Sequence, residues 1–221
     1  MRGTNPKRPP EKSNGDTLLV QEVFATLQGE GLYAGWPAVF IRLGGCNLAC
    51  HFCDTQFENF SEITREALLA RVKQLAAPDG TRICKLVVIT GGEPFRQEIS
   101  PLCEALLAEG FLVQIETNGT LFRALPDAVQ VMCSPKAVDG KYYPLRPDIL
   151  ARANALKFLI SEATPPYQNV PFTASDCPIY VQPMDEYDAV TNKKNQQLAL
   201  SLALRHGYRL SLQTHKILEI P

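Results

Sequence analysis

The sequence has no apolar run near the length of roughly 18 residues that a membrane-spanning helix requires. An excess of one charge is also missing, because 22 Lys and Arg residues nearly balance 23 Asp and Glu residues and the formal net charge is -1. This balance gives no electrostatic reason to expect nucleic acid or an anionic membrane as a partner. Residues 1–16 also lack the apolar segment of a secretory signal. We therefore expect a cytoplasmic protein.

The first residues of the chain contain few apolar side chains, and Pro6, Pro9 and Pro10 lie close together. Such a segment cannot bury enough apolar surface to become ordered. We therefore expect residues 1–16 to form a disordered N-terminal tail. Residues 17–221 have a length typical of one domain. Hydrophobic residues make up 45% of the chain, which is sufficient for a core.

Short apolar runs alternate along the chain with segments of helical periodicity. Thr64 is a suitable N-cap for the first helix, and Gly110 and Gly207 are suitable ends for the next two. Strands that alternate with helices favour a parallel sheet. We expect strands at 18–25, 37–43, 84–89, 111–116, 129–133, 156–161, 179–182 and 208–212, and helices at 64–77, 97–109 and 196–206.

Two of the connections between these strands are unsuited to a helix. Residues 117–128 are too few for a full crossover helix with its turns. Residues 162–178 include Pro165, Pro166 and Pro171, which oppose helix formation. The sequence therefore predicts an α/β protein, a partial, open parallel (β/α)6-type barrel of about six strands with a reduced number of helices.

Three of the seven cysteines, Cys46, Cys50 and Cys53, have the spacing C-x3-C-x2-C. In a cytoplasmic protein such a group indicates metal binding or catalysis rather than a disulfide framework. Thiolates are the usual ligands of iron–sulfur clusters. Three thiolates on a 4Fe–4S cube leave one iron without a protein ligand. That iron is free to bind the amino and carboxylate groups of S-adenosylmethionine (SAM).

Two alternatives for the cysteine group remain open. Structural zinc prefers a tetrahedron of ligands, and His51 could complete it, although it lies cramped between two of the cysteines. A cluster that only transfers electrons usually has a fourth cysteine nearby. The remaining cysteines lie in apolar stretches and are expected to be buried free thiols; they are Cys84, Cys103, Cys133 and Cys177.

Polar or glycine residues follow three successive expected strands. Gly91 and Gly92 come after the most apolar strand, Glu116 and Asn118 end the next, and Ser134 follows the third. Ligands of parallel α/β sheets bind at the carboxyl ends of the strands. These residues are expected to share one pocket, with solvent-exposed strand ends as the alternative.

Arg42 lies within an apolar strand, four residues before the first cysteine of the group. A charge in such a position is unfavourable unless it is paired. The guanidinium group binds a carboxylate with two parallel hydrogen bonds. The partner of Arg42 is therefore either the carboxylate of a ligand or an acidic side chain of the protein.

The motifs together resemble those of a known family. The cysteine spacing and Gly91-Gly92-Glu93-Pro94 are similar to signatures of the radical SAM superfamily. Further segments resemble the 7-carboxy-7-deazaguanine synthases, and the likeness covers nearly the whole of residues 18–221. These segments are LQGEG at 27–31, FIRL at 40–43, CDT at 53–55, IETNG at 115–119, SPK at 134–136 and QTHK at 213–216.

The resemblance implies a single radical SAM domain over residues 17–221 with a shortened partial barrel. It implies a lyase that converts 6-carboxy-5,6,7,8-tetrahydropterin to 7-carboxy-7-deazaguanine and ammonia, in the biosynthesis of queuosine and other 7-deazapurines. The implied cofactors are a 4Fe–4S cluster, SAM and Mg²⁺. A homodimer and an electron donor such as flavodoxin or ferredoxin are also implied, without nucleic acid or membrane as partner.

The resemblance also assigns residues to the site. Cys46, Cys50 and Cys53 would bind the cluster, and Thr55 would bind Mg²⁺. The residues expected to bind SAM are Phe52, Asp54, Gly92, Glu93, Glu116, Ser134, Lys136 and Gln182. The residues expected to bind the substrate are Leu27, Gln28, Gly29, Glu30, Arg42, Thr90, His215 and Pro221.

Some of these assignments agree with the chemistry of the side chains. The amide of Gln28 and the carboxylate of Glu30 can pair with the edge of a pterin, as proteins read guanine-like edges. The hydroxyl of Thr55 is a hard ligand suited to Mg²⁺, and His215 can exchange protons near neutral pH. Two rival functions remain, a glycyl-radical-enzyme activase and an iron–sulfur electron carrier without enzymatic activity.

Overall fold

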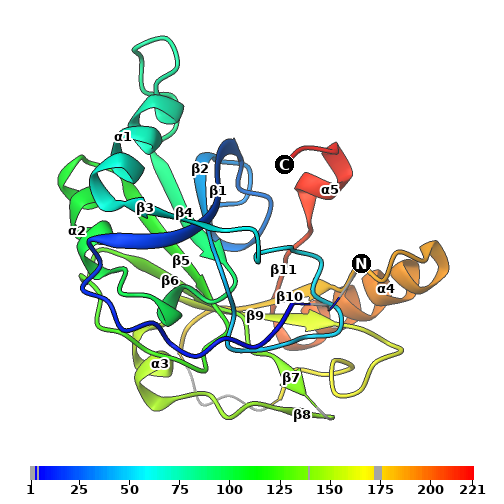
Figure 1. Ribbon diagram of the computed structural model, residues 1–221. Helices are drawn as coiled ribbons and strands as arrows, with labels where there is room; N and C mark the ends of the chain where they lie inside the picture. The colour runs from blue at the N-terminus through cyan, green and yellow to red at the C-terminus, as the bar shows by residue number, and fades with distance from the viewer. Residues whose placement is uncertain (1–2, 4, 139, 172–175) are drawn as a thin grey trace.

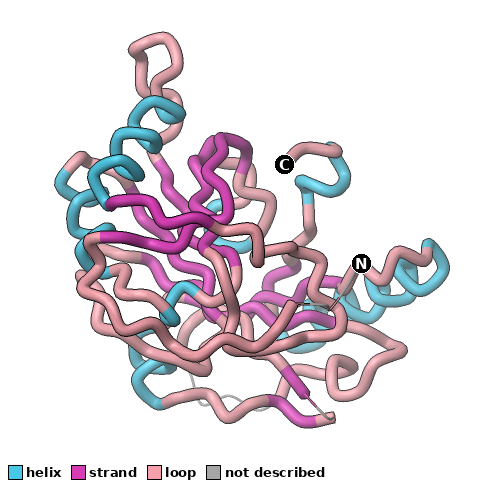
Figure 2. Tube along the Cα trace, in the orientation of Figure 1, coloured by secondary structure: helices cyan, strands magenta, loops and turns pink. Residues whose placement is uncertain are grey.

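The computed structural model describes residues 3, 5–138, 140–171 and 176–221 (Figure 1). Strands and helices alternate along most of this part of the chain (Figure 2). The strands are β1 (Thr17–Leu27), β2 (Pro37–Leu43), β3 (Ser61–Thr64), β4 (Leu86–Gly91), β5 (Leu112–Thr117), β6 (Gln130–Cys133), β7 (Ala137–Val138), β8 (Lys141–Tyr142), β9 (Ala155–Ile160), β10 (Ile179–Pro183) and β11 (Arg209–Leu210). The helices are α1 (Arg65–Ala76), α2 (Ser100–Ala108), α3 (Pro147–Arg152), α4 (Ala189–His206) and α5 (Thr214–Leu218), with short 3-10 turns at η1 (Gly31–Tyr33) and η2 (Pro94–Arg96).

A 9-stranded sheet has the order β11-β10-β9-β6-β5-β4-β2-β1-β3, and β7 pairs separately with β8. Every neighbouring pair from β2 to β11 is parallel. The strands β1 and β3 are added antiparallel at one edge, so the sheet is open rather than closed. The predicted fold class, a mostly parallel open sheet with few helices, is confirmed.

The sheet has more strands than the roughly six that connection lengths suggested. β3 was not predicted, because its sequence Ser-Glu-Ile-Thr carries little of the apolar alternation that indicates a strand. It forms by pairing with the first residues of β1, where Thr17 lies opposite Thr64. The last expected strand is shorter than predicted, since only Arg209 and Leu210 pair with β10.

The core lies between the sheet and the helices that cover its outer face. In β4, Leu86, Val87, Val88 and Ile89 are all fully buried, as expected for a central parallel strand covered on both faces. Val87 and Ile89 belong to the large cluster that packs under α1 and α2, whereas Leu86 and Val88 face the opposite side. Figure 1 shows α1, α2 and α3 on the outside of the curved sheet.

Helix ends follow the expected capping chemistry. The Thr64 hydroxyl accepts a hydrogen bond from the Ala67 amide at 3.2 Å and confirms the predicted N-cap of α1. α4 ends at Gly207, which has a left-handed φ of 72°. It begins well before the predicted start at 196, because the Asp188 side chain caps the Thr191 amide at 2.8 Å. Residues 118–129, all described, contain no helix, as their length predicted.

The N-terminal segment, for which the sequence predicts a disordered tail, contacts the domain. Of this tail, residues 1, 2 and 4 lie outside the described residues. Residues 5–16 lie against the domain, where Lys7 forms a parallel bridge with Cys46 and the amide of Glu11 donates to the Arg96 carbonyl at 2.7 Å. Main-chain pairing and ion pairs, rather than apolar burial, make these contacts, and the disordered tail stays a prediction.

No helix among the described residues is both long enough and apolar enough to cross a membrane.

Candidate active site

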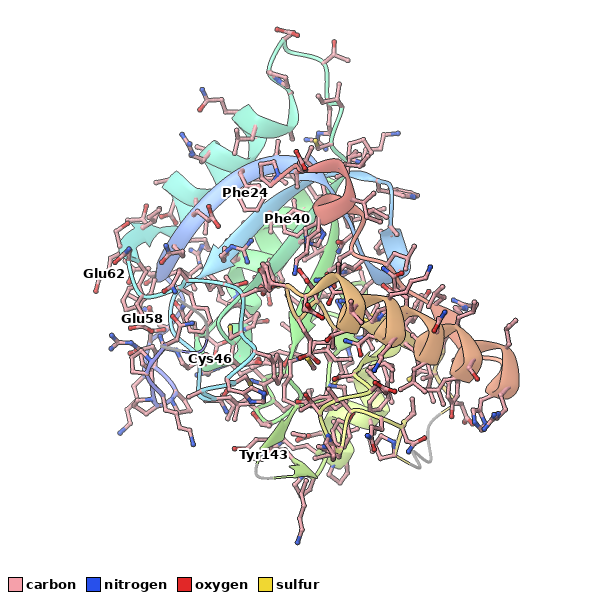
Figure 3. All side chains as sticks on the ribbon, turned by 90° about the vertical axis from the view of Figure 1, so that its right-hand side faces the viewer. Phe24, Phe40, Cys46, Glu58, Glu62 and Tyr143 are labelled. Atoms are coloured by element: carbon pink, nitrogen blue, oxygen red, sulfur yellow. The ribbon has the colours of Figure 1, made fainter. Side chains whose placement is uncertain are left out.

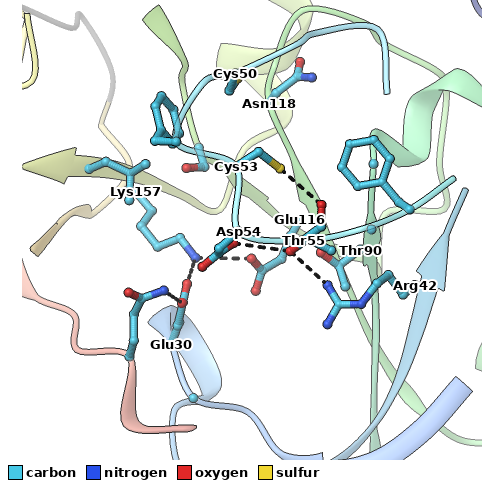
Figure 4. A pocket seen from close by; sticks show the side chains of 18 of the residues that line it. Glu30, Arg42, Cys50, Cys53, Asp54, Thr55, Thr90, Glu116, Asn118 and Lys157 are labelled. Atoms are coloured by element: carbon cyan, nitrogen blue, oxygen red, sulfur yellow. Dashed lines mark hydrogen bonds and ion pairs between the residues drawn. The ribbon is translucent and has the colours of Figure 1, made fainter. Parts of the chain in front are cut away.

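A cavity of about 440 Å³ opens at the carboxyl ends of the parallel strands. Its wall is built from the last residues of successive strands and the loops that follow them, as the switch-point rule for open α/β sheets predicts. Arg42 comes from β2, Thr90 from β4, Glu116 from β5, and Lys157 from β9 (Figure 4). All the strand-end residues that were expected to share one pocket line this cavity, which excludes the alternative of solvent-exposed strand ends for them; they are Gly91, Gly92, Glu116, Asn118 and Ser134.

Cys46, Cys50 and Cys53 all line this cavity, in the loop that follows β2. Cys46 is buried, Cys50 and Cys53 are partly buried, and all have free thiols. Figure 3 shows Cys46 in the interior, beneath the β1–β2 edge where Phe24 and Phe40 lie. No fourth cysteine is found among the described residues that line the cavity.

Burial controls the protonation of these thiols. Desolvation raises the pKa of Cys46 to about 12 and also raises the pKa values of Cys50 and Cys53. A metal ligand must be the thiolate. Iron binding therefore has to displace three protons, and the metal would supply the positive charge that stabilises three thiolates in this buried position.

The glycine pair after β4 packs directly against the start of the cysteine loop. A Cβ atom on Gly92 would lie 1.8 Å from the Gly45 carbonyl oxygen, and Gly91 has a φ of 117°. The Glu93 amide donates to the same Gly45 carbonyl at 3.0 Å. No other residue fits at position 92, so the loop fixes the position of the backbone just before Cys46.

Glu93 itself does not line the cavity, unlike its expected position beside SAM. Its fully buried carboxylate accepts hydrogen bonds from the Thr117 hydroxyl at 2.7 Å, the Asn118 amide at 2.8 Å and the Phe95 amide at 3.0 Å. These hydrogen bonds occupy both oxygens of the carboxylate. Burial outweighs these hydrogen bonds and raises the pKa of Glu93 to about 7. Glu93 therefore holds the end of β5 in place.

A charged group at the other side of the cavity consists of Lys157, Glu30 and Glu116 (Figure 4). The Lys157 ammonium forms an ion pair with Glu30 and a second with Glu116 at 3.2 Å. Burial would raise the pKa of Glu30, but the charge of Lys157 outweighs it and lowers that pKa. The Gln28 amide also donates to Glu116 at 2.9 Å. The loop at 28–30 is therefore held against β5 and β9.

Arg42 has an acidic partner in the protein. Its Nε donates to the Glu22 carboxylate at 2.6 Å, and its NH1 donates to the Thr55 hydroxyl at 3.5 Å. The guanidinium carbon also lies 5.6 Å from the centre of the Phe24 ring, which stacks on Phe40 with centroids 5.4 Å apart. Both rings line the cavity. The internal ion pair that the sequence left open is thus present, and Arg42 still borders the cavity.

The C-terminal segment covers the loop at 28–30. The Thr214 amide and hydroxyl both donate to the Gly29 carbonyl, at 3.2 and 3.0 Å. A Cβ atom on Gly29 would lie 2.3 Å from Nδ1 of His215, so these two residues are in close contact. At the end of the chain the Pro221 carbonyl accepts from Thr26 at 2.9 Å. His215 and Pro221 consequently line the cavity, as expected.

Comparison with known proteins agrees with this geometry. A sequence model of the radical SAM superfamily matches residues 40–147. The 7-carboxy-7-deazaguanine synthase of Rickettsia prowazekii is 50% identical over 224 residues, covering 100% of this chain and 96% of the relative. The chain belongs to this synthase family. The Rhodospirillum rubrum synthase is 41% identical over 242 residues and is covered completely. The crystal structure of QueE from Escherichia coli superposes with a TM-score of 0.72 at 29% identity, over 89% of this chain and 94% of QueE.

Membership of the radical SAM superfamily implies a 4Fe–4S cluster and SAM. The residues present fit both groups, because three thiols line a cavity that polar strand ends also border. Lys136 is among the latter, and its ammonium donates to the Ser134 carbonyl at 2.8 Å and to the Ser134 hydroxyl at 2.5 Å. Burial lowers the pKa of Lys136. Membership of the synthase family, rather than of the superfamily, is what does not favour the two rival functions.

Apart from Glu93, every residue that the sequence assigned to the cluster, magnesium, SAM or the substrate lines the cavity of this synthase-family chain. Sequence reasoning missed several further lining residues. Lys157 carried a usable signal, since it is a lone charge in the apolar strand Ala-Leu-Lys-Phe-Leu-Ile. Phe40, Gln213 and Lys216 lie in segments that carried the family resemblance, although no role was assigned to them, whereas nothing in the sequence singled out Asn5 or Phe24.

Proposed function

We propose that the protein is a radical SAM carbon–nitrogen lyase that converts 6-carboxy-5,6,7,8-tetrahydropterin to 7-carboxy-7-deazaguanine with release of ammonia. Two relatives that carry that synthase name are 50% and 41% identical over the whole chain. The observation that carries the proposal is the composition of the cavity, with three thiols on one side and a paired set of polar groups on the other. When bound, the cluster and SAM supply the radical that starts the reaction.

The substrate is assigned to the side of the cavity formed by the loop at 28–30. Gln28 and Glu30 offer an amide and a carboxylate, which can pair with the amino and ring N–H groups of a pterin. Lys157 supports this assignment because it keeps Glu30 ionised and fixed in one position. Leu27, Gly29 and Thr90 complete this side, and the Phe24 and Phe40 rings offer apolar faces for a flat ring system.

The carboxylate of the substrate is assigned to Arg42 and to a magnesium ion. Glu22 occupies Nε of Arg42 and NH1 makes a long contact of 3.5 Å with the Thr55 hydroxyl, which leaves NH2 and the second hydrogen of NH1 for a ligand in the cavity. The Thr55 hydroxyl lies next to Arg42 and is the protein ligand proposed for Mg²⁺. Magnesium commonly keeps few protein ligands and takes its others from water and substrate oxygens.

SAM is assigned to the opposite wall, close to the cysteines. The groups proposed to bind it are the backbone at Gly92 and the side chains of Phe52, Asp54, Ser134, Lys136 and Gln182, together with Glu116, which reaches SAM from the charged group on the substrate side. Ser134 and Lys136 are already hydrogen-bonded to each other, so their polar atoms are fixed before a ligand enters. Glu93 supports this wall from behind through Thr117 and Asn118.

His215 and Pro221 are proposed to close the substrate side of the cavity. A histidine in contact with Gly29 is suitably placed to accept or donate a proton during loss of ammonia. We also propose that the protein acts in the cytoplasm as a homodimer. A flavodoxin or ferredoxin would supply electrons, and the product would enter queuosine or another 7-deazapurine.

The test is an anaerobic incubation of the reconstituted protein with SAM, Mg²⁺, a reductant and the carboxypterin. We expect an ultraviolet-absorbing deazapurine acid to accumulate together with ammonia, and SAM to be regenerated. Formation of 5′-deoxyadenosine without a deazapurine, with this pterin, would assign the protein to another radical SAM reaction. A protein that binds iron but never cleaves SAM would be an electron carrier.

A further inference from the structure

Residues 5–11, here called the strap, cross the cysteine loop although the sequence gives them almost nothing to bury. The Arg8 amide donates to the Cys46 carbonyl at 2.7 Å, next to the bridge between Lys7 and Cys46. Just before the strap, the Gly3 amide donates to the Cys53 carbonyl at 3.3 Å. The N-terminal segment thus contacts the main chain of the first and the last of the three cysteines.

Charged groups anchor the strap on both sides. Nε and NH2 of Arg8 donate to one oxygen of Glu58 at 2.8 and 2.6 Å. Arg96, which is fully buried, donates to the Pro9 carbonyl at 2.8 Å and to the Glu11 carboxylate at 2.6 Å. Figure 3 shows the N-terminal segment beside Glu58 and Cys46. A buried guanidinium needs such partners, so these contacts hold the strap in place.

Arg96 also connects the strap to the loop that precedes the cysteines. Its NH2 donates to the Gly44 carbonyl at 3.1 Å. A Cβ atom on the neighbouring Gly45 would lie 2.8 Å from the same NH2 and 2.9 Å from Cδ of Arg8. The strap, the glycine pair at 44–45 and the start of the cysteine loop therefore form one packed unit.

Asn5 is the residue of the strap that borders the cavity. It is only 5% exposed, and its amide nitrogen lies 2.8 Å from the Thr55 carbonyl and 3.9 Å from the sulfur of Cys53. Its amide oxygen is buried and accepts no hydrogen bond within the described part of the chain. An unpaired buried acceptor costs about 1–3 kcal/mol, so this oxygen points to a hydrogen-bond donor of a ligand in the cavity, while the amide nitrogen is the atom that faces the cysteine sulfur.

We propose that the strap is a cover for the iron–sulfur cluster and that Asn5 tunes its reduction potential. The inference rests on the proposed function, because it needs a cluster at Cys46, Cys50 and Cys53. The potential of such clusters depends on hydrogen bonds to the sulfurs and on solvent exposure. The Asn5 amide places donor hydrogens beside the Cys53 sulfur, and a donor there stabilises the reduced, more negative cluster. The strap also limits access of water and oxygen to that side.

The test uses full-length protein reconstituted with iron and sulfide under anaerobic conditions. Asn5→Leu removes both polar atoms at nearly constant size, and Asn5→Asp replaces the donor with a negative charge. Asn14→Leu is the matched control, because Asn14 is exposed and its hydrogen bonds among the described residues are to Asp16. The measurements are the midpoint potential by electron paramagnetic resonance titration and the rate at which cluster absorbance is lost in air.

We expect both Asn5 variants to have a more negative midpoint potential than wild type, with the larger shift in Asn5→Asp, and a several-fold faster loss of the cluster in air. Failure of Asn5→Leu to retain a cluster, with an unchanged circular dichroism spectrum, would also support the cover. Potentials and decay rates equal to those of Asn14→Leu would overturn the inference. A wild-type protein that binds no cluster would instead overturn the proposed function.

Discussion

Lys157 and Glu30 form a buried ion pair across the cavity, although the two residues are 127 positions apart in the chain. The Lys157 side chain is only 4% exposed, and Glu116 is its second partner. The lysine therefore links β9 and β5 to the loop after β1. A single ammonium group sets the position of a loop that we assign to substrate recognition.

Lys157→Met is expected to lower both stability and substrate affinity. Removal of one partner of a buried ion pair leaves uncompensated charge and typically costs about 3–5 kcal/mol. The thermal unfolding midpoint and the KM for the pterin are the measurements. Lys194→Met is the control, because Lys194 pairs with Glu162 at 3.5 Å on the exposed surface and such pairs contribute about 0–1 kcal/mol. Equal effects of the two substitutions would contradict the role of Lys157.

The buried carboxyl group of Glu93 should make the free energy of unfolding depend on pH. Burial raises its pKa from the ordinary 4.5 to about 7. Between these values the folded state holds a proton that the unfolded state has lost. The contribution of Glu93 to the free energy of unfolding is therefore fully present below pH 4.5. It is lost as the pH rises toward 7, and the free energy of unfolding falls by about 3 kcal/mol at most.

In Glu93→Gln this loss between pH 4.5 and 7 should disappear, so the variant gains stability relative to wild type as the pH rises. Urea unfolding of the cluster-free protein across this range is the measurement. Glu62→Gln, an exposed carboxylate on β3, is the control for the loss of one negative charge. If the free energy of unfolding depends on pH in the same way in Glu93→Gln and in wild type, the three hydrogen-bond donors keep the wild-type carboxylate ionised.

Much of this fold could be predicted because it depends on local patterns. β4 is a continuous apolar run followed by Gly91 and Gly92, so its burial and the loop after it were evident from sequence. α4 shows the limit of such patterns. Its first turns are polar, and its start depends on a cap by Asp188 rather than on apolar periodicity.

Two features of the site could not be predicted because they depend on distant partners. Lys157 was visible as a charge in an apolar strand, but nothing local indicates that Glu30 and Glu116 neutralise it. The strap was expected to be disordered because it has little to bury. Its contacts with the domain run through Arg96, whose position in the fold is set by the loop after β4 and could not be read from the N-terminal sequence.

Gly92→Ala is expected to impair cluster loading. The added methyl group would lie 1.8 Å from the Gly45 carbonyl and would displace the backbone just before Cys46. Iron content and visible absorbance after reconstitution are the measurements. Gly80→Ala is the control, since Gly80 has a left-handed φ of 79° but open space around it, and only backbone strain of about 1–2 kcal/mol applies there. Normal loading in Gly92→Ala would contradict the proposed packing.

Alanine substitution of the cysteines should separate ligands from core residues. Cys50→Ala is expected to lose the cluster and all turnover, because it removes one of three thiolates. Cys103→Ala is the control, since Cys103 is fully buried in the main core and does not line the cavity. It should retain iron and activity with a modest loss of stability. Full activity in Cys50→Ala would contradict the three-thiolate cluster.

Arg42 and Glu22 provide the last test, because the same guanidinium pairs with a protein carboxylate and borders the cavity. Arg42→Lys keeps the charge but removes the fork, and loss of a hydrogen bond to a charged group costs about 1.5–3 kcal/mol. Affinity for the carboxypterin should fall roughly tenfold or more, while affinity for a pterin without the carboxylate should be unchanged. Calorimetric titration of both ligands is the measurement.

Glu22→Gln is the matched control, because Glu22 is half exposed and its pair with Arg42 contributes little. If Arg42→Lys binds the carboxylated ligand as tightly as wild type does, the role of Arg42 is limited to its ion pair with Glu22.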